Sequence, residues 1–153
     1  VWPVMSHHIV SARKLVSAES AVLTLTLPHA ERHRRRGLLV TDAGEEIMLD
    51  LPHATELADG AALELDDGRR VAIRAAVEPL AEVRAEGAAL ARLAWHVGNR
   101  HTPAEIGWGW LLIRRDPVLE AMLAGLGATV AHVEAPFRPE GGAYGHGRTH
   151  SHD

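Results

Sequence analysis

The chain has 153 residues, the usual size of one domain, although two small domains of about 70 residues each would also fit. Its 46% hydrophobic and 24% charged residues are typical of a globular protein. The absence of cysteine excludes disulfides, Fe–S clusters and thiolate metal sites. The net charge of -4, with all 11 histidines counted as neutral, argues against a general polyanion binder. A metal held by this chain must therefore be bound by His, Asp, Glu or backbone donors.

Neither a membrane segment nor a targeting signal is evident. No apolar run approaches the roughly 18 to 20 residues that a membrane helix requires. The first ten residues, VWPVMSHHIV, lack the basic start and long apolar stretch of a signal peptide. We therefore expect a cytoplasmic protein that does not associate with membranes.

The first 75 residues predict four or five short strands and no helix. AVLTLTL alternates apolar and hydroxyl residues with period two, as a half-buried strand does. Ala43-Gly44 and Asp66-Asp67-Gly68 are turn signals, and each predicts a hairpin. The expected strands are residues 21–27, 37–42, 45–51, 62–65 and 70–75.

The pattern changes after Val77-Glu78-Pro79. Residues 87–97 are rich in Ala and Leu and precede Gly98, which is suited to a left-handed helix cap. Asp116-Pro117 is a second helix start, with Asp at the cap and Pro in the first turn. The expected strands of this half are residues 80–85, two short ones with a bend within 102–113, and 128–133.

These elements predict an α+β fold with three parts. Residues 1–77 would form an all-β domain, and residues 78–136 a ferredoxin-like domain of order βαββαβ. Residues 137–153 contain many glycines and few apolar side chains, which predicts a flexible tail that carries histidines. This fold is shared by unrelated functions, so only the residues of a site can identify the activity.

Histidines dominate the candidate chemistry. His96 is near the end of the first helix of the second half, and His101 follows in the stretch WHVGNRH. If the helix continued, their side chains would point roughly 140° apart, so they are poor partners for one ion.

The tail supplies His146, His150 and His152, and imidazole suits Zn, Cu, Ni and Fe. If His96 lay at a two-fold axis, two copies would provide two nitrogens and the tails would provide the rest. The residues alone leave two interpretations open: His96 is an ordinary packed or surface histidine, or it forms a metal site in a homodimer with the tail histidines as further ligands.

Two longer stretches carry a resemblance. WHVGNRH and DPVLEAMLAGLGATVAHVEAPFRPEGGAYGHG resemble the urease accessory protein UreE family of nickel metallochaperones, across the whole second half of the chain. The N-terminal strands agree with the β-rich peptide-binding domain of that family. The resemblance implies that no residue is catalytic and that the cargo is Ni(II), with Zn(II) or Cu(II) also able to bind in vitro.

By the same resemblance, His96 matches the histidine that binds nickel between two subunits, and the tail histidines match the variable C-terminal ligands. His101, Asn99 and Arg100 are then structural or support the ligands. The implied partners are the urease apoprotein and the accessory complex that includes the GTPase UreG, with no nucleic acid and no membrane. Some members carry histidines where this chain has Arg114-Arg115-Asp116-Pro117, so we expect no accessory metal site there.

Two other functions remain open at this level. A metal-dependent hydrolase could use His96 with Glu105 or Glu134 to activate a water, although no HExxH-like spacing is present. An RNA- or peptide-binding module could use the basic cluster from Arg32 to Arg36. That cluster is more simply a solvated loop or edge strand, because no aromatic residues are interleaved with it.

Overall fold

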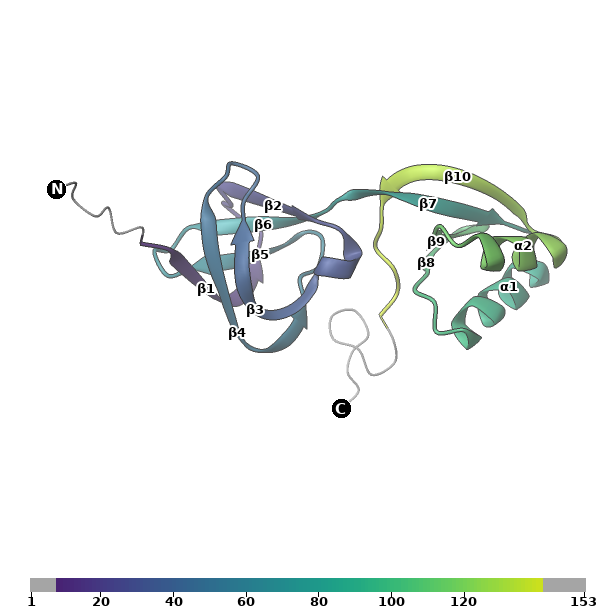
Figure 1. Cartoon of the computed structure of the whole chain (residues 1–153), viewed down its shortest axis with the longest axis horizontal. Coiled ribbons are helices and arrows are strands. Elements are labelled where there is room, and N and C mark those ends of the chain that lie inside the picture. Colours follow the sequence, from purple (N-terminus) through teal and green to yellow (C-terminus); the bar gives the residue numbers. More distant parts are fainter. Residues whose placement is uncertain (1–7, 142–153) are drawn as a thin grey trace. The chain divides into compact units, whose positions relative to one another are not determined.

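The computed structural model describes residues 8–141 and has the predicted α+β fold (Figure 1). The chain forms two compact units that divide between Arg74 and Ala75, and each unit has its own hydrophobic core. Among the described residues, no helix is long and apolar enough to cross a membrane.

The first unit is a six-stranded sheet in the order β2-β6-β5-β1-β4-β3. Its core is made of aliphatic side chains such as Leu25, Ile47, Leu49 and Leu63, all at most 1% exposed. A single 3-10 turn, η1, separates β2 from β3. The elements are β1 (Val10–Ser17), β2 (Leu23–Leu27), η1 (His29–Glu31), β3 (His33–Val40), β4 (Glu46–Glu56), β5 (Ala61–Leu65) and β6 (Arg70–Ala75).

The two outer strands of this sheet are tied together by Asp42, which follows β3. The Asp42 amide donates to the Thr24 carbonyl of β2 at 2.9 Å. Its carboxylate accepts the Thr24 and Thr26 hydroxyls at 2.6 and 2.7 Å. The Thr24 hydroxyl is the main reason why the pKa of Asp42 is lowered. The sheet therefore curls back on itself, and its edges are partly closed.

Strand β1 was absent from the predicted strands. Its central Arg13-Lys14 pair interrupts the apolar alternation, and a register shift lies between Ala12 and Lys14. The strand is held by partners far away in sequence, because it pairs in parallel with β4 and antiparallel with β5. Arg13 and Lys14 point outward and form ion pairs with Asp50 and Glu64.

The basic cluster runs from buried Arg32, which follows η1, into the edge strand β3. Residues from His33 onward form β3, at the end of the strand order, which matches the expected edge position. Arg36 pairs with Asp50 at 3.0 Å, and Arg35 donates to the Leu51 carbonyl at 3.2 Å. Arg32, in contrast, is 1% exposed, so the expectation that the whole cluster is solvated was wrong. The positive charges of Arg35 and Arg36 mainly serve contacts within the sheet.

The second unit has the predicted βαββαβ order. Its four strands form an antiparallel sheet in the order β10-β7-β9-β8. Asp116 caps the second helix, because its carboxylate accepts the Leu119 amide at 3.0 Å and Pro117 begins the first turn. The elements are β7 (Val77–Arg84), α1 (Ala88–Asn99), β8 (Glu105–Gly107), β9 (Trp110–Arg114), α2 (Pro117–Gly125) and β10 (Thr129–Pro136).

The two faces of this sheet are covered differently. On one face, Val83 and Leu111 pack with Leu93 of α1 and Leu119 of α2. On the opposite face, Leu80 and Leu112 form a smaller cluster with Phe137, which is fully buried. Alternation along β7 and β9 places neighbouring residues on opposite faces. The helices therefore cover one face, while part of the other is covered by the chain that follows β10.

Candidate metal centre

His96 lies in the last turn of α1, on the partly exposed side of the helix. Leu93 and Val97 hold α1 against the sheet, and His96 falls between them in sequence but remains half-buried. Its neighbour Trp95 is 64% exposed, and the two rings meet edge to face with centroids 5.1 Å apart. An imidazole therefore reaches the surface beside a large apolar side chain.

Helix α1 ends later than the sequence indicated. Gly98 was expected to be the left-handed cap, but the helix continues through Asn99, and His101 has the positive φ of 56°. The Thr102 amide donates to the Val97 carbonyl at 3.2 Å, and the His101 amide donates to the Gly98 carbonyl at 3.0 Å. These two bonds form a Schellman-type helix end, with a histidine where glycine is usual. The expectation for Gly98 was wrong because this longer-range bond selects the end.

The residues around His101 have backbone roles in this helix end. Asn99 is the last helical residue, and Arg100 caps the helix with its amide directed at the His96 and Val97 carbonyls, at 3.3 and 3.2 Å. The His101 side chain is exposed. His101 itself has a left-handed backbone conformation. The angle of roughly 140° between the His96 and His101 side chains assumed a continuous helix and therefore does not apply.

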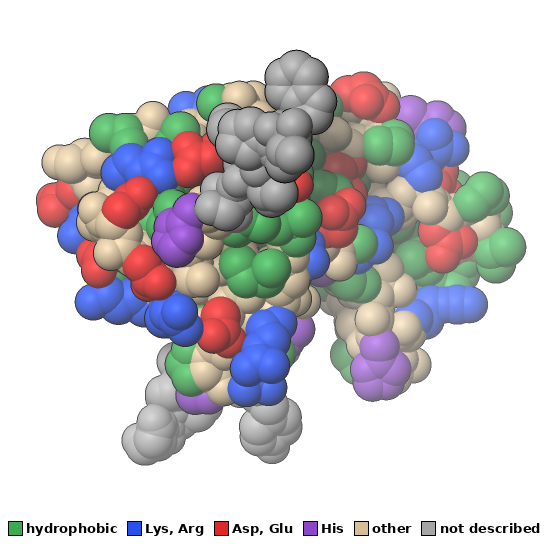
Figure 2. All heavy atoms as spheres, turned by 60° about the vertical axis from the view of Figure 1, so that its left-hand side comes forward, with side chains coloured by type: hydrophobic (Ala, Val, Ile, Leu, Met, Phe, Trp, Pro, Cys, Tyr) green, Lys and Arg blue, Asp and Glu red, His purple; other side chains and the backbone are tan. Residues whose placement is uncertain are grey.

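Within residues 8–141, no three His, Asp or Glu side chains lie close enough to hold a metal ion together. Histidines are scattered over the face shown in Figure 2 rather than gathered in one patch. The other predicted ligands, His146, His150 and His152, lie outside the described residues. The described part of one chain thus offers His96 as a donor without further protein ligands around it.

The carboxylates considered for a hydrolytic site do not gather around His96. One Glu105 oxygen accepts the Arg138 amide at 2.8 Å. Glu134 is exposed on β10, in register with Pro79. Neither residue belongs to a cluster of three potential metal ligands in the described part of the chain.

A cluster of polar side chains that the sequence did not predict joins α2 to β10. Glu120 is 8% exposed, and one of its oxygens accepts Arg115 Nε at 3.0 Å and the Asp116 amide at 2.7 Å. His132 Nε2 lies 3.0 Å from the other oxygen. Burial raises the pKa of Glu120, but the hydrogen bonds from Asp116, Arg115 and His132 outweigh it and hold the pKa below its ordinary value. Arg115 and Asp116 therefore belong to an ion-paired start of α2 that is joined to β10 through His132.

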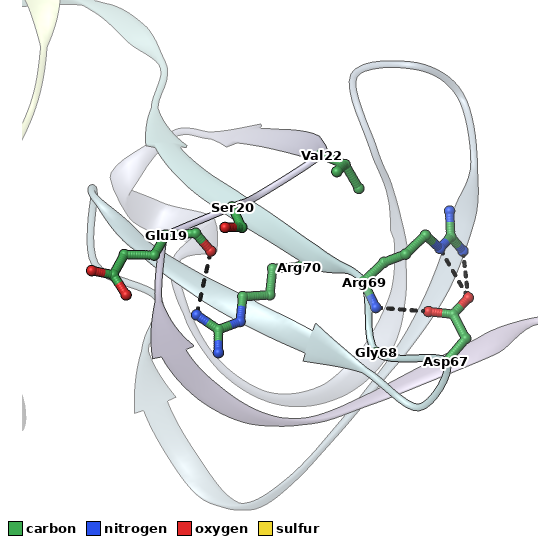
Figure 3. Close-up of a pocket in the computed structure, with 7 residues that line it drawn as sticks. All are labelled: Glu19, Ser20, Val22, Asp67, Gly68, Arg69 and Arg70. Atoms are coloured by element: carbon green, nitrogen blue, oxygen red, sulfur yellow. Dashed lines mark hydrogen bonds and ion pairs between the residues drawn. The ribbon is translucent and has the colours of Figure 1, made fainter.

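An open hollow in the first unit is lined by residues that include no histidine, and ion pairs lie at its rim (Figure 3). Arg69 pairs with Asp67 and, through both terminal nitrogens, with Glu45, and these bonds raise its pKa. Arg70 donates to the Ser17 and Glu19 carbonyls. Both guanidinium groups therefore serve to hold the turns at the rim of the hollow.

Comparison with known proteins identifies relatives along nearly the whole chain. The Urease accessory protein UreE of Azorhizobium caulinodans is 51% identical over 145 residues, which cover 90% of this chain and 70% of that protein. The protein of the same name from Chelativorans sp. is 53% identical over 131 residues, covering 85% and 81% of the two chains. The one from Ruegeria pomeroyi is 51% identical over 128 residues, covering 84% and 85%.

Family models match both halves. The N-terminal domain of UreE urease accessory protein matches residues 7–76, and its C-terminal domain matches residues 78–153. The resemblance found in the WHVGNRH and DPVLEAML stretches is thereby confirmed. The chain belongs to the UreE urease accessory protein family.

Proposed function

We propose that this protein is a nickel metallochaperone that binds Ni(II) as a homodimer and delivers it to apo-urease during assembly of the urease metallocentre. The observation that carries the proposal is the placement of His96 at the exposed end of α1, in a chain of the urease accessory family. A urease accessory protein assists urease and need not be an enzyme itself. Nickel is then cargo, and no residue needs to be catalytic.

A homodimer would supply the ligands that one His96 lacks. Two copies joined at α1 would bring two imidazoles together, and exposed Trp95 offers apolar surface for such a contact. His146, His150 and His152 of the two tails would complete the shell. Imidazole nitrogens suit Ni(II), and Zn(II) or Cu(II) would bind the same donors in vitro.

This division of ligands suits a carrier. A cargo ion must leave, and donors on a tail whose glycine-rich composition predicts flexibility can dissociate one at a time. A catalytic metal site instead needs ligands held rigidly around an open position. His101, Asn99 and Arg100 would support the helix end that presents His96.

The remaining parts fit the same role. Residues 1–77 would act as a peptide-binding-like domain for urease or its accessory complex, including the GTPase UreG. Residues 78–136 would bind the metal with the tail of residues 137–153. Delivery to apo-urease would take place in the cytoplasm, without nucleic acid or membrane partners.

Nickel titration by calorimetry tests this function, with the oligomeric state followed by light scattering. The proteins are wild type, His96→Ala, a chain truncated before Gly145, and His53→Ala as a control that removes an exposed imidazole from the first unit. We expect His96→Ala to abolish the tight site, the truncation to weaken it and the control to leave it unchanged. Tight binding that survives His96→Ala but is lost on truncation would overturn the assignment of the primary ligand.

A further inference from the structure

The chain that follows β10 takes a defined path across the second unit. Pro136, the last residue of β10, pairs with Val77 of β7 at one edge of the sheet. Phe137 is then buried between Leu80 of β7 and Leu112 of β9, on the face opposite the helices. Residues 137–140 therefore lead away from β10, toward β8 at the opposite edge of the sheet (Figure 1).

Two hydrogen bonds donated by backbone amides complete this path at the β8 edge. The Arg138 amide donates to the Glu105 carboxylate at 2.8 Å. The Glu140 amide donates to the Ala104 carbonyl at 2.8 Å. The guanidinium of Arg114 lies over the Phe137 ring, 5.9 Å from its centre, and adds a cation–π contact. In the strand order, β8 is three spacings away from β10. At about 4.8 Å per spacing, the two strands lie about 14 Å apart.

The endpoint of this path lies close to the helix end that carries His96. Ala104 is two residues beyond Thr102, whose amide is bonded to the Val97 carbonyl at 3.2 Å. With at most about 3.6 Å per residue, Ala104 is within roughly 11 Å of the Val97 carbonyl. The last described residue, Gly141, therefore starts the histidine tail beside the loop between α1 and β8.

We propose that residues 137–140 are an anchor that fixes the origin of the tail next to His96, with Glu105 as its positioning residue. The proposal rests on the proposed nickel function and deepens it, because it identifies what brings the tail ligands to the metal. From Gly141, His146 is five residues away and can reach roughly 17 Å when extended. Without the two amide hydrogen bonds the tail would start at buried Phe137, nine residues from His146 and over β7 and β9 rather than at β8.

The size of the effect follows from chain statistics. The effective concentration of a tethered ligand falls roughly as the −3/2 power of tether length. Lengthening the tether from five to nine residues therefore lowers it by about 2.4-fold, and displacement of the origin away from β8 adds to this. We expect loss of these two hydrogen bonds to weaken tail-dependent nickel binding by at least about twofold.

A pair of charge-matched double variants tests the anchor in the full-length chain. Glu105→Ala with Glu140→Pro removes the carboxylate acceptor and the amide donor. Glu105→Gln with Glu140→Ala also removes both carboxylates, but keeps an acceptor oxygen and the amide. Neither pair alters Phe137 or the core beneath the helices. Nickel affinity is measured by calorimetry, and release of the segment by hydrogen exchange of the Arg138 amide.

The Ala/Pro pair should bind nickel at least about twofold more weakly than the Gln/Ala pair, with faster exchange at Arg138. In chains truncated before Gly145, the two pairs should bind nickel equally. Equal affinity of the full-length pairs despite faster exchange would overturn the anchor, and slow exchange in both would overturn the positioning role of Glu105. If wild-type binding depends on neither His96 nor the tail, the nickel function itself fails, which is a separate outcome.

Discussion

The contact between α2 and β10 depends on Glu120, and its replacement should weaken the second unit. Its two oxygens serve Arg115, Asp116 and His132 at 3.0, 2.7 and 3.0 Å, in a side chain that is 9% exposed. A net hydrogen bond contributes about 1 kcal/mol, and somewhat more when a partner is charged. Arg115 is 36% exposed, so solvent screens its part. We expect Glu120→Ala to cost about 3 kcal/mol and Glu120→Gln about 1 kcal/mol.

The stability that Glu120 contributes should decrease as the pH is lowered. Because the folded-state pKa of Glu120 is lowered from 4.5, its contribution is fully present above that value and is lost as the pH falls through the folded-state pKa. Urea unfolding followed by tryptophan fluorescence reports mainly on the second unit, since three of the four tryptophans, Trp95, Trp108 and Trp110, belong to it. The difference between wild type and Glu120→Gln should shrink between pH 7 and pH 3. A difference that is absent at pH 7, or equal at both pH values, would refute the reasoning.

Two further substitutions test local geometry in the same unit. His101→Gly should leave stability unchanged or raise it by up to about 1 kcal/mol in urea unfolding, because glycine adopts the positive φ of 56° without strain. Nickel affinity measured by calorimetry should stay within twofold if His101 is not a ligand. A large loss of affinity would make His101 a ligand. Gly107→Ala should destabilise the unit by about 1 to 3 kcal/mol, because a Cβ would come within 2.0 Å of the Trp110 ring. Unchanged urea unfolding of this variant would show that the ring moves freely.

The sequence predicted the elements that depend on local signals. The hairpin between β5 and β6 follows from Asp66-Asp67-Gly68, and α2 follows from Asp116-Pro117. Strand β1 could not be predicted in this way, because its stability comes from β4 and β5, and its charged centre has partners that only the folded sheet supplies. The helix end at His101 could not be predicted for a similar reason. The hydrogen bond from the Thr102 amide to the Val97 carbonyl determines where α1 ends, although Gly98 is the residue that locally favours a left-handed cap.

The candidate site was predicted only in part, for a related reason. The histidine pattern and the family resemblance both indicated His96, but the structure was needed to place it beside exposed Trp95. The cluster around Glu120 was not predictable, because His132 lies 12 residues further along the chain on another element. Residues 137–140 were predicted to belong to a flexible tail because the C-terminal stretch has few apolar residues. In the structure, buried Phe137 and two hydrogen bonds from backbone amides hold them against the sheet.

On the proposed function, the position of the tail origin determines how nickel could leave. His96 belongs to a helix packed through Leu93 and Val97, so it cannot move without disturbing the core. The proposed tail ligands come after Gly141 in sequence, outside the anchor of residues 137–140, so on this proposal they would exchange without any change in the sheet. A partner protein that supplies competing ligands would then replace the tail donors first and His96 last. The anchor raises affinity through proximity rather than through an additional ligand, so tight binding and rapid release are compatible in one site.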